Sequence, residues 1–292
     1  MEENLVMLSN YEFNLSDFAL FLSVMKNPRA YRNVLSIFLE EPDIELAEVK
    51  VEQVVLNKSG KRAIRLDAWA KSTDDRRFNM EMQNDTSKDD VRKRSRYYQG
   101  LLDSPILKSG KETRYKYLPS TVIIFITQDD IFGMDRAQYT FSEQCEEIAG
   151  LKLDDGTKKI FFNLTSKNGS QELISLLQYM KRTDIQNPDI TVKDERILEL
   201  DDIVQEVKAS EEWEAVKMSI LEIGIEKGTE IGIQRGLQQG LQQGLQQGLQ
   251  QKLREQVEKK LKKGLSVAEI ADMLEEEESV IVQIVEIINN NK

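Results

Sequence analysis

Two short segments of the chain carry acidic and amide side chains at a spacing that could hold a metal ion. RLDAWA carries Asp67, and RRFNMEMQ carries Glu81 and Gln83 two positions apart. If the two segments pair as an antiparallel hairpin with a turn near Asp74, Asp67 lies opposite Glu81. Directly opposed Cβ atoms are about 4.5–5.5 Å apart, which is close enough for two carboxylates to share one cation.

This arrangement predicts metal-assisted phosphodiester hydrolysis. Asp67, Glu81 and the backbone carbonyl of Met82 can hold Mg²⁺ or Mn²⁺ and leave water molecules on the ion. Such an ion lowers the pKa of a bound water and neutralises charge on a phosphate. Gln83 shares a face with Glu81 because side chains alternate along a strand, so it can hydrogen-bond the attacking water or a phosphate oxygen. The alternative is an ordinary charged hairpin at the surface.

Composition excludes several other hydrolytic chemistries. The 292-residue chain has no histidine and one cysteine, Cys145. Histidine-dependent serine and cysteine hydrolases, histidine-ligated zinc, cysteine-cluster zinc and an intrachain disulfide are therefore ruled out. Hydrolysis would depend on carboxylates, lysine or tyrosine, together with a hard metal ion on oxygen ligands.

Charge is distributed unevenly along the chain. The net charge of −11 argues against nucleic acid as a partner, but residues 191–292 contribute −8 of it, whereas residues 58–116 sum to +7. A local basic surface is what a DNA backbone requires. The candidate nucleic-acid contacts are Arg92, Lys93, Arg94, Arg96 and Tyr97. The alternatives are a solvated helix face for the basic side chains and core packing for the tyrosine.

No apolar run reaches the roughly 18 residues that span a bilayer, and the N-terminus lacks the layout of a signal peptide. With a single cysteine, the sequence favours a cytoplasmic protein without a membrane segment.

Periodicity predicts the elements that position these residues in a mixed α/β domain over roughly residues 10–185. The strands and helices alternate in the order helix, three-stranded meander, helix, strand. The segments are one or two helices within 14–40, strands at 48–58, 63–70 and 77–83, a helix at 87–103 capped by Ser87, a buried strand at 120–127, a strand at 158–166 and a helix at 171–182.

The remainder of the chain predicts an α-helical extension. Residues 195–223 continue with helical periodicity, and glycine then recurs at every fourth position from Gly224 to Gly248. Seven interior glycines destabilise an isolated helix by roughly 0.8–1 kcal/mol each, so the repeat is either a flexible linker or a helix that packs through its glycine faces in a homo-oligomer. Residues 261–288 predict two short helices whose connecting acidic run, Glu275–Glu278, disfavours DNA reading.

The spacing D-x(13)-E-x-Q resembles the PD-(D/E)XK nuclease superfamily, and more closely its recombination-promoting nuclease and transposase family of bacteria. The matching stretches are RLDAWA, RRFNMEMQ, RSRYYQGLLDSPILKSGKETRYKYLPSTVIIFIT, YTF and IFFNLTS. The resemblance implies a restriction-endonuclease-like core and a metal-dependent DNA endonuclease. By that likeness Asp67 and Glu81 bind the metal, Gln83 takes the place of the superfamily lysine, and Glu40 is a candidate for an acid on the first helix.

The expected organisation has four parts: a nuclease-like domain at 1–190, a helical connector at 191–223, a repeat helix for oligomerisation at 224–256 and a small helical segment at 257–292. Two other functions remain open. One is a nucleic-acid-binding module whose active site is weak or inactive, as Gln83 in place of a lysine would indicate. The other is an oligomeric scaffold protein.

Overall fold

The computed structural model describes residues 11–55, 63–87, 89–107 and 114–290, and it contains a six-stranded mixed sheet in the order β1-β2-β3-β4-β6-β5. The strands are β1 (Leu46–Val55), β2 (Ile64–Ser72), β3 (Arg77–Gln83), β4 (Thr121–Thr127), β5 (Gln138–Phe141) and β6 (Thr157–Asn163). The chain divides into two compact units, Met1–Met218 and Ser219–Lys292.

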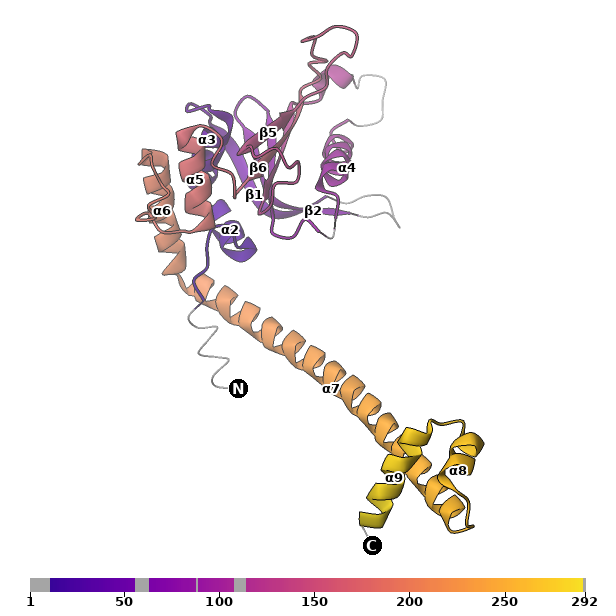
Figure 1. Ribbon diagram of the computed structural model, residues 1–292. Helices are drawn as coiled ribbons and strands as arrows, with labels where there is room; N and C mark the ends of the chain where they lie inside the picture. Colours follow the sequence, from indigo (N-terminus) through magenta and orange to yellow (C-terminus); the bar gives the residue numbers. More distant parts are fainter. Residues whose placement is uncertain (1–10, 56–62, 88, 108–113, 291–292) are drawn as a thin grey trace. The chain divides into compact units, whose positions relative to one another are not determined.

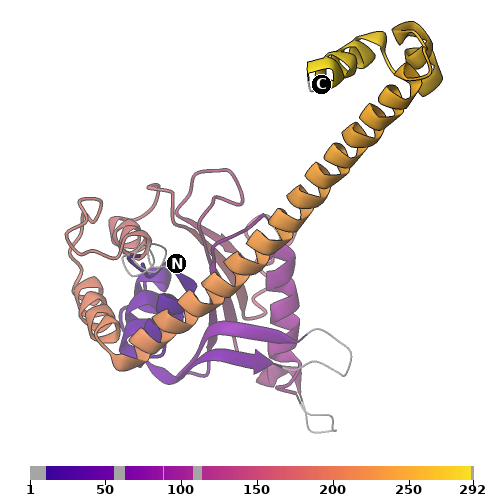
Figure 2. The same ribbon diagram turned by 90° about the horizontal axis from the view of Figure 1, so that it is seen from below.

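The helices of the first unit are α2 (Phe18–Met25), α3 (Pro28–Leu39), α4 (Val91–Asp103), α5 (Gln171–Lys181), α6 (Glu195–Lys208) and the start of α7 (Glu211–Leu261), with a short 3₁₀ turn at Tyr115–Tyr117. Figures 1 and 2 show α2, α3 and α5 on one side of the sheet and α4 on the other. The unit is therefore a helix–sheet–helix sandwich.

The first three strands form the predicted antiparallel meander. Ala68 faces Met80 and Ala70 faces Phe78, so the register of the β2–β3 hairpin is the predicted one. A turn follows β2, in which the Asp75 N–H donates to the Ser72 carbonyl at 3.1 Å and Asp75 has a φ of 70°. The last three residues of the strand predicted at 48–58 lie outside the described residues.

The rest of the sheet is largely parallel. β3 pairs in parallel with β4, and β4 with β6, whereas the short edge strand β5 runs antiparallel to β6. Helix α4 is thus the crossover between two neighbouring parallel strands, as such a connection requires. The sequence pattern did not predict β5, because its four residues are too few to show a period.

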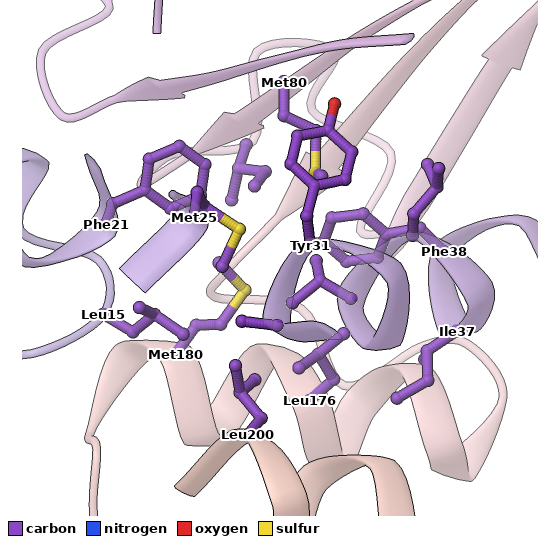
Figure 3. Packing of buried hydrophobic residues seen from close by; sticks show 14 of the residues in the cluster. Leu15, Phe21, Met25, Tyr31, Ile37, Phe38, Met80, Leu176, Met180 and Leu200 are labelled. Atoms are coloured by element: carbon purple, nitrogen blue, oxygen red, sulfur yellow. The ribbon is translucent and has the colours of Figure 1, made fainter. Parts of the chain in front are cut away.

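A large apolar core lies between the sheet and helices α2, α3, α5 and α6. Strand β3 contributes Phe78, Met80 and Met82 to it, as the period of two predicts. In Figure 3, Met80 and Tyr31 lie together in this core with Phe38 on the same side, and Leu176 and Met180 of α5 lie at the opposite side of the cluster. The Tyr31 hydroxyl donates to the carbonyl oxygens of Ala68 and Phe78, each at 3.4 Å, and so ties α3 to the hairpin.

The opposite face of the sheet carries a smaller core beneath α4. Strand β4 is buried along its whole length, as predicted, and its residues alternate between the two cores. Ile123 and Phe125 face α4, where they pack with Tyr98 and Leu102. This face is therefore apolar beside β3, which makes the polar residues of β3 on the same face conspicuous.

The predicted start of α4 was wrong. The helix begins at Val91, and its N-cap is Asp90, whose carboxylate accepts the N–H groups of Arg92 and Lys93. Ser87 instead bonds to the Asp85 carboxylate in the preceding turn. Both residue types are favoured caps, so composition alone could not choose between them.

The second unit is built on the later part of α7 with α8 (Val267–Leu274) and α9 (Glu278–Asn290). The predicted pair of short helices is confirmed, and Ser266 opens α8 with a capping box that includes Glu269. The three helices share a small core of Val257, Ile270, Ala271, Ile281 and Ile288.

The glycine repeat lies within α7 and is helical throughout. Among the described residues, a Cβ atom added at any glycine from Gly224 to Gly248 would meet no atom within 4 Å outside its chain neighbours and the helix's own backbone. The described part of the single chain therefore gives these glycines no packing role. No helix in the described part of the chain combines the length and the apolar character that crossing a bilayer requires.

Candidate active site

Asp67 and Glu81 lie next to each other where β2 and β3 separate. The regular cross-strand pairs end at Ala68 and Met80, one position before these two acids. In place of a further backbone pair, the Asp67 N–H donates to Glu81 Oε1 at 3.0 Å, and the Met82 N–H donates to Asp67 Oδ2 at 3.1 Å. Each acid therefore binds the backbone of the opposite strand, and this fixes both carboxylates at the opening of the hairpin.

A local distortion of β1 and β2 accompanies Asp67. The β1–β2 ladder pairs Val51 with Ala68 and Gln53 with Leu66, but it skips Glu52 and Asp67 between them. Glu52 has a φ of 50°, which is uncommon for a residue with a side chain. Leu66 packs beneath α4, and Ala68 packs in the larger core on the other face. In a regular strand two residues that are two positions apart would point to the same face. The distortion thus occurs at the residue that the site needs, as irregularities near functional sites often do.

Strand β3 presents a row of polar side chains to α4. Asn79 and Glu81 are both fully buried, and Asn79 Nδ2 donates to Glu81 Oε1 at 3.0 Å. Asn79 Oδ1 is buried, and it has no hydrogen-bond partner among the described residues. Asn79 therefore orients Glu81 from within the strand.

Arg94 lies at the centre of the site and holds several of its polar groups. From the first turn of α4, its Nη2 donates to Glu81 Oε2 at 2.8 Å and its Nη1 donates to Gln83 Oε1 at 2.7 Å. Its Nε donates to the Tyr98 hydroxyl at 2.9 Å, one helical turn further along. The guanidinium carbon also lies 5.0 Å from the centre of the Tyr98 ring, within the range of a cation–π contact.

Burial sets the protonation behaviour of the two acids. Burial, and next the Asp67 carboxylate, raise the pKa of Glu81 to about 8, even though Arg94 and the two hydrogen bonds to Oε1 act to lower it. Burial likewise raises the pKa of Asp67 to about 6, against the lowering effect of the Met82 N–H and of Arg94. Two carboxyls with raised pKa values in one place are typical of functional sites.

A cavity of about 590 Å³ opens onto the site between the start of β2 and α4. It is lined by Ala63, Ile64, Arg65, Asp67, Asp89, Lys93, Arg94, Tyr97 and Tyr98. Asp67 and Arg94 reach this cavity, and the fully buried Glu81 lies beneath Arg94. Arg65 and Lys93 form a basic rim at the opening, which Asp89 also lines. Arg65 pairs with Glu52 at 3.6 Å, and Lys93 pairs with Asp90 at 3.7 Å.

The structure divides the five predicted nucleic-acid contacts. Arg94 belongs to the acidic centre, and Lys93 and Tyr97 line the cavity beside it. Arg92 pairs with the capping Asp90 at 3.3 Å, and its side chain is 63% exposed. Arg96 is exposed on the same helix.

Three residues of the site were not among the site residues predicted from the sequence. They are Arg65, Asn79 and Tyr98. Signals for them were present: Arg65 and Asn79 each precede an acid by two positions on a strand, and Tyr98 follows Arg94 by one helical turn. Glu40, the candidate acid of the first helix, is an exposed residue in the left-handed C-cap of α3.

The donor set suits a hard cation. Asp67 and Glu81 supply carboxylate oxygens, and Gln83 supplies an amide oxygen, all of which Mg²⁺ and Mn²⁺ accept. Asp67 Oδ2 already accepts the Met82 N–H, which leaves Oδ1 and the second lone pair of Oδ2 as possible ligands of a cation. In the part of the chain that the structure describes, no group of three or more acidic, histidine or cysteine side chains gathers to hold a metal. A cation here would therefore have two carboxylate ligands and complete its shell with neutral oxygens and water.

Comparison with known proteins identified a family. The family described as PD-(D/E)XK nuclease family transposase matches residues 17–223, which include the whole sheet and the candidate site. The comparison with curated proteins gave no match, and neither did the comparison with solved structures.

Proposed function

The chain belongs to the PD-(D/E)XK nuclease family transposases, and from that premise we propose that it is a metal-dependent DNA endonuclease. The observation that carries the proposal is the contact between Asp67 and Glu81, which places two carboxylates with raised pKa values at the mouth of one hairpin. Nucleases of this superfamily generally use divalent metal ions. A nuclease and transposase-like role on DNA follows from the family, and the residue roles below are our proposal.

In this proposal Asp67 and Glu81 hold Mg²⁺ or Mn²⁺, with the carbonyl of Met82 as a third ligand. When bound, the ion supplies an activated water and neutralises charge on the phosphate. Asn79 holds Glu81 in place through its amide. Gln83 positions the attacking water or a phosphate oxygen, a task that a neutral amide performs by hydrogen bonding alone.

The basic rim of the cavity would hold the DNA backbone. Arg65 and Lys93 line the opening, and Arg92 and Arg96 are exposed nearby on α4. Guanidinium and ammonium groups in this arrangement bind phosphates without reading sequence. Tyr97 also lines the cavity and offers a ring for base stacking.

We also propose that the C-terminal part of the chain makes a homo-oligomer. Leu237, Leu241, Leu245 and Leu249 are exposed along α7 beside open glycine faces. Two copies would supply two active centres, one for each strand of a duplex. The division into a nuclease-like domain, a connector, a repeat helix and a terminal segment is part of this proposal.

A second candidate function has a specific observation in its favour. Glu81 is fully buried, and both Glu81 and Gln83 are bound to Arg94. If Arg94 never leaves, the domain binds DNA without cutting it.

Cleavage of supercoiled plasmid tests the choice. With Mg²⁺ or Mn²⁺ the protein should nick or linearise plasmid, and Asp67→Asn and Glu81→Gln should reduce this to background because each removes a metal ligand. Asp75→Asn is the matched control: it removes an exposed acid from the turn of the same hairpin, and asparagine tolerates the left-handed backbone there.

The possible results separate the two functions. Metal-dependent cleavage that both site variants lose supports the nuclease. DNA binding with steep salt dependence and no cleavage in any sample would instead establish the binding module.

A further inference from the structure

The two oxygens of Glu81 have different partners, and this difference decides where a cation can bind. Oε1 accepts two hydrogen bonds from groups fixed in the strands, the Asp67 N–H and the Asn79 amide, each at 3.0 Å. A carboxylate oxygen has two lone pairs, so Oε1 is saturated. Oε2 is the oxygen left for a metal ion, and Arg94 holds it at 2.8 Å.

Arg94 also stands between Glu81 and the cavity. Arg94 lines the cavity with its side chain 23% exposed, whereas the side chain of Glu81 has no exposed surface. A metal ion that enters from the cavity must therefore displace the guanidinium to reach Glu81.

A guanidinium and a divalent ion exclude each other at this oxygen. Both are cations, and at a few ångströms in a poorly solvated site their repulsion is large. Gln83 is involved in the same way, because its Oε1 accepts from Arg94 at 2.7 Å. While Arg94 stays in place, the Gln83 oxygen is already hydrogen-bonded and the proposed metal ligand Glu81 is already neutralised.

The surroundings of Arg94 provide a second partner for it. Its helix carries Lys93, which is 76% exposed and lines the same cavity, and Arg65 lies across the opening on β2. A phosphate held by this rim would be within reach of a guanidinium that has left Glu81. Arginine binds phosphate through paired hydrogen bonds, so the exchange of one anion for another keeps its charge compensated.

We infer that Arg94 is the resting cation of the site and couples metal binding to DNA binding: it occupies Glu81 Oε2 until a divalent ion takes that oxygen and a DNA phosphate takes the guanidinium. The inference rests on the proposed nuclease function and adds a mode of regulation to it. Metal without DNA must displace Arg94 with no new partner for the guanidinium, and DNA without metal must draw Arg94 from a buried carboxylate. Each ligand therefore strengthens the binding of the other by the same factor.

The test measures Mn²⁺ affinity of the full chain by calorimetry, alone and with a short duplex whose phosphorothioate linkages slow cleavage. The wild type should bind Mn²⁺ more tightly with the duplex, by about 5–150-fold, the usual range for coupled sites. Arg94→Gln should bind Mn²⁺ about tenfold more tightly than wild type without DNA, and it should lose most of the gain from DNA. Arg94→Lys keeps a competing charge, so it should stay close to wild type without DNA.

Arg76→Gln is the matched control. Arg76 is 28% exposed and bridges the carboxylates of Glu41 and Asp74 at the far end of the same hairpin. The Arg76→Gln variant should have the same Mn²⁺ affinity as wild type, both without and with the duplex. Circular dichroism of each variant checks that it is folded, and the effect of the duplex on wild type needs no variant at all.

The outcomes distinguish this inference from the function on which it rests. If Asp67→Asn abolishes Mn²⁺ binding but Arg94→Gln binds no more tightly than wild type, the metal site stands and the role of Arg94 is overturned. An unchanged Mn²⁺ affinity of the wild type on addition of the duplex overturns it as well. If no variant binds Mn²⁺, the metal site falls and this inference falls with it.

Discussion

Glu81 and Arg94 form a buried ion pair in which each member compensates the other. Removal of one partner would leave an uncompensated charge in a poorly solvated place. The free-energy cost of that charge exceeds the net stabilisation that the intact pair provides. The pair is also asymmetric. Asn79 and the Asp67 backbone hold the Glu81 carboxylate, whereas the Arg94 guanidinium lies at the end of a long flexible side chain. At the residue scale, the arginine is the member that can move.

The raised pKa of Glu81 predicts how stability depends on pH in the absence of metal. An unfolded glutamate titrates near its ordinary value of about 4.3, whereas folded Glu81 titrates near 8. Between these values the folded state binds more protons than the unfolded state, so stability falls as pH rises through this window and levels off above it. Asp67, with a pKa of about 6, adds to the fall in the lower part of the window.

Thermal melting in a chelating buffer from pH 4 to 9 would measure this dependence. Glu81→Gln should flatten the curve above pH 6, because it removes the carboxyl whose pKa is raised. The exposed Asp75→Asn variant should follow wild type. A wild-type melting temperature that rises steadily between pH 6 and 8 would contradict the raised pKa of Glu81.

At the scale of elements, α4 serves both the fold and the site. It connects the parallel strands β3 and β4, it covers the smaller core through Tyr98 and Leu102, and it carries Arg94 in its first turn. The position of Arg94 over Glu81 therefore depends on where this helix begins, and that start is fixed by the carboxylate of Asp90.

Replacement of the cap tests that dependence. Asp90→Ala should lower the melting temperature by a few degrees and reduce cleavage, because the first turn that presents Arg94 loses its cap. Ser87→Ala should change the melting temperature much less, since the bonds from Ser87 to Asp85 are local to the turn. Thermal melting and the plasmid assay would give both readouts. A larger effect of Ser87→Ala would mean that the helix begins one turn earlier.

At the scale of the whole molecule, the chain is two compact units that share one long helix. The core of the first unit closes on the start of α7 through Trp213 and Val216, and the second unit has its own small core around Val257. Between these cores the exposed leucines and open glycine faces of α7 have no partner among the described residues.

The glycine faces permit a prediction about assembly. Gly236→Ala, Gly240→Ala and Gly244→Ala together should stabilise the isolated helix by roughly 0.8–1 kcal/mol for each glycine. If the glycine faces pack closely between copies, as we expect, the same change should nonetheless lower the oligomer mass in light scattering, because three methyl groups enter the contact. An unchanged mass would favour a helical spacer over an oligomerisation element.

The sequence alone determined the strand pairing at the heart of the site. The period of two and the turn after β2 place Asp67 beside Glu81 and put Glu81 on the face opposite Met80 and Met82. These are local rules, which act over a few residues and need no knowledge of the rest of the chain. The same holds for the buried strand β4 and for the two short C-terminal helices.

Only the tertiary structure decided what surrounds the two acids. Arg94 appeared in the sequence as one of several basic residues on a helix, and only the packing of α4 on the sheet turns it, rather than Arg92 or Arg96, toward Glu81. The skipped pair at Glu52 and Asp67 likewise has no local signal, because it arises where two strands change the core that they face. Local periodicity sets which residues share a strand face, whereas contacts between segments distant in sequence set burial, pKa and the partner of each charge.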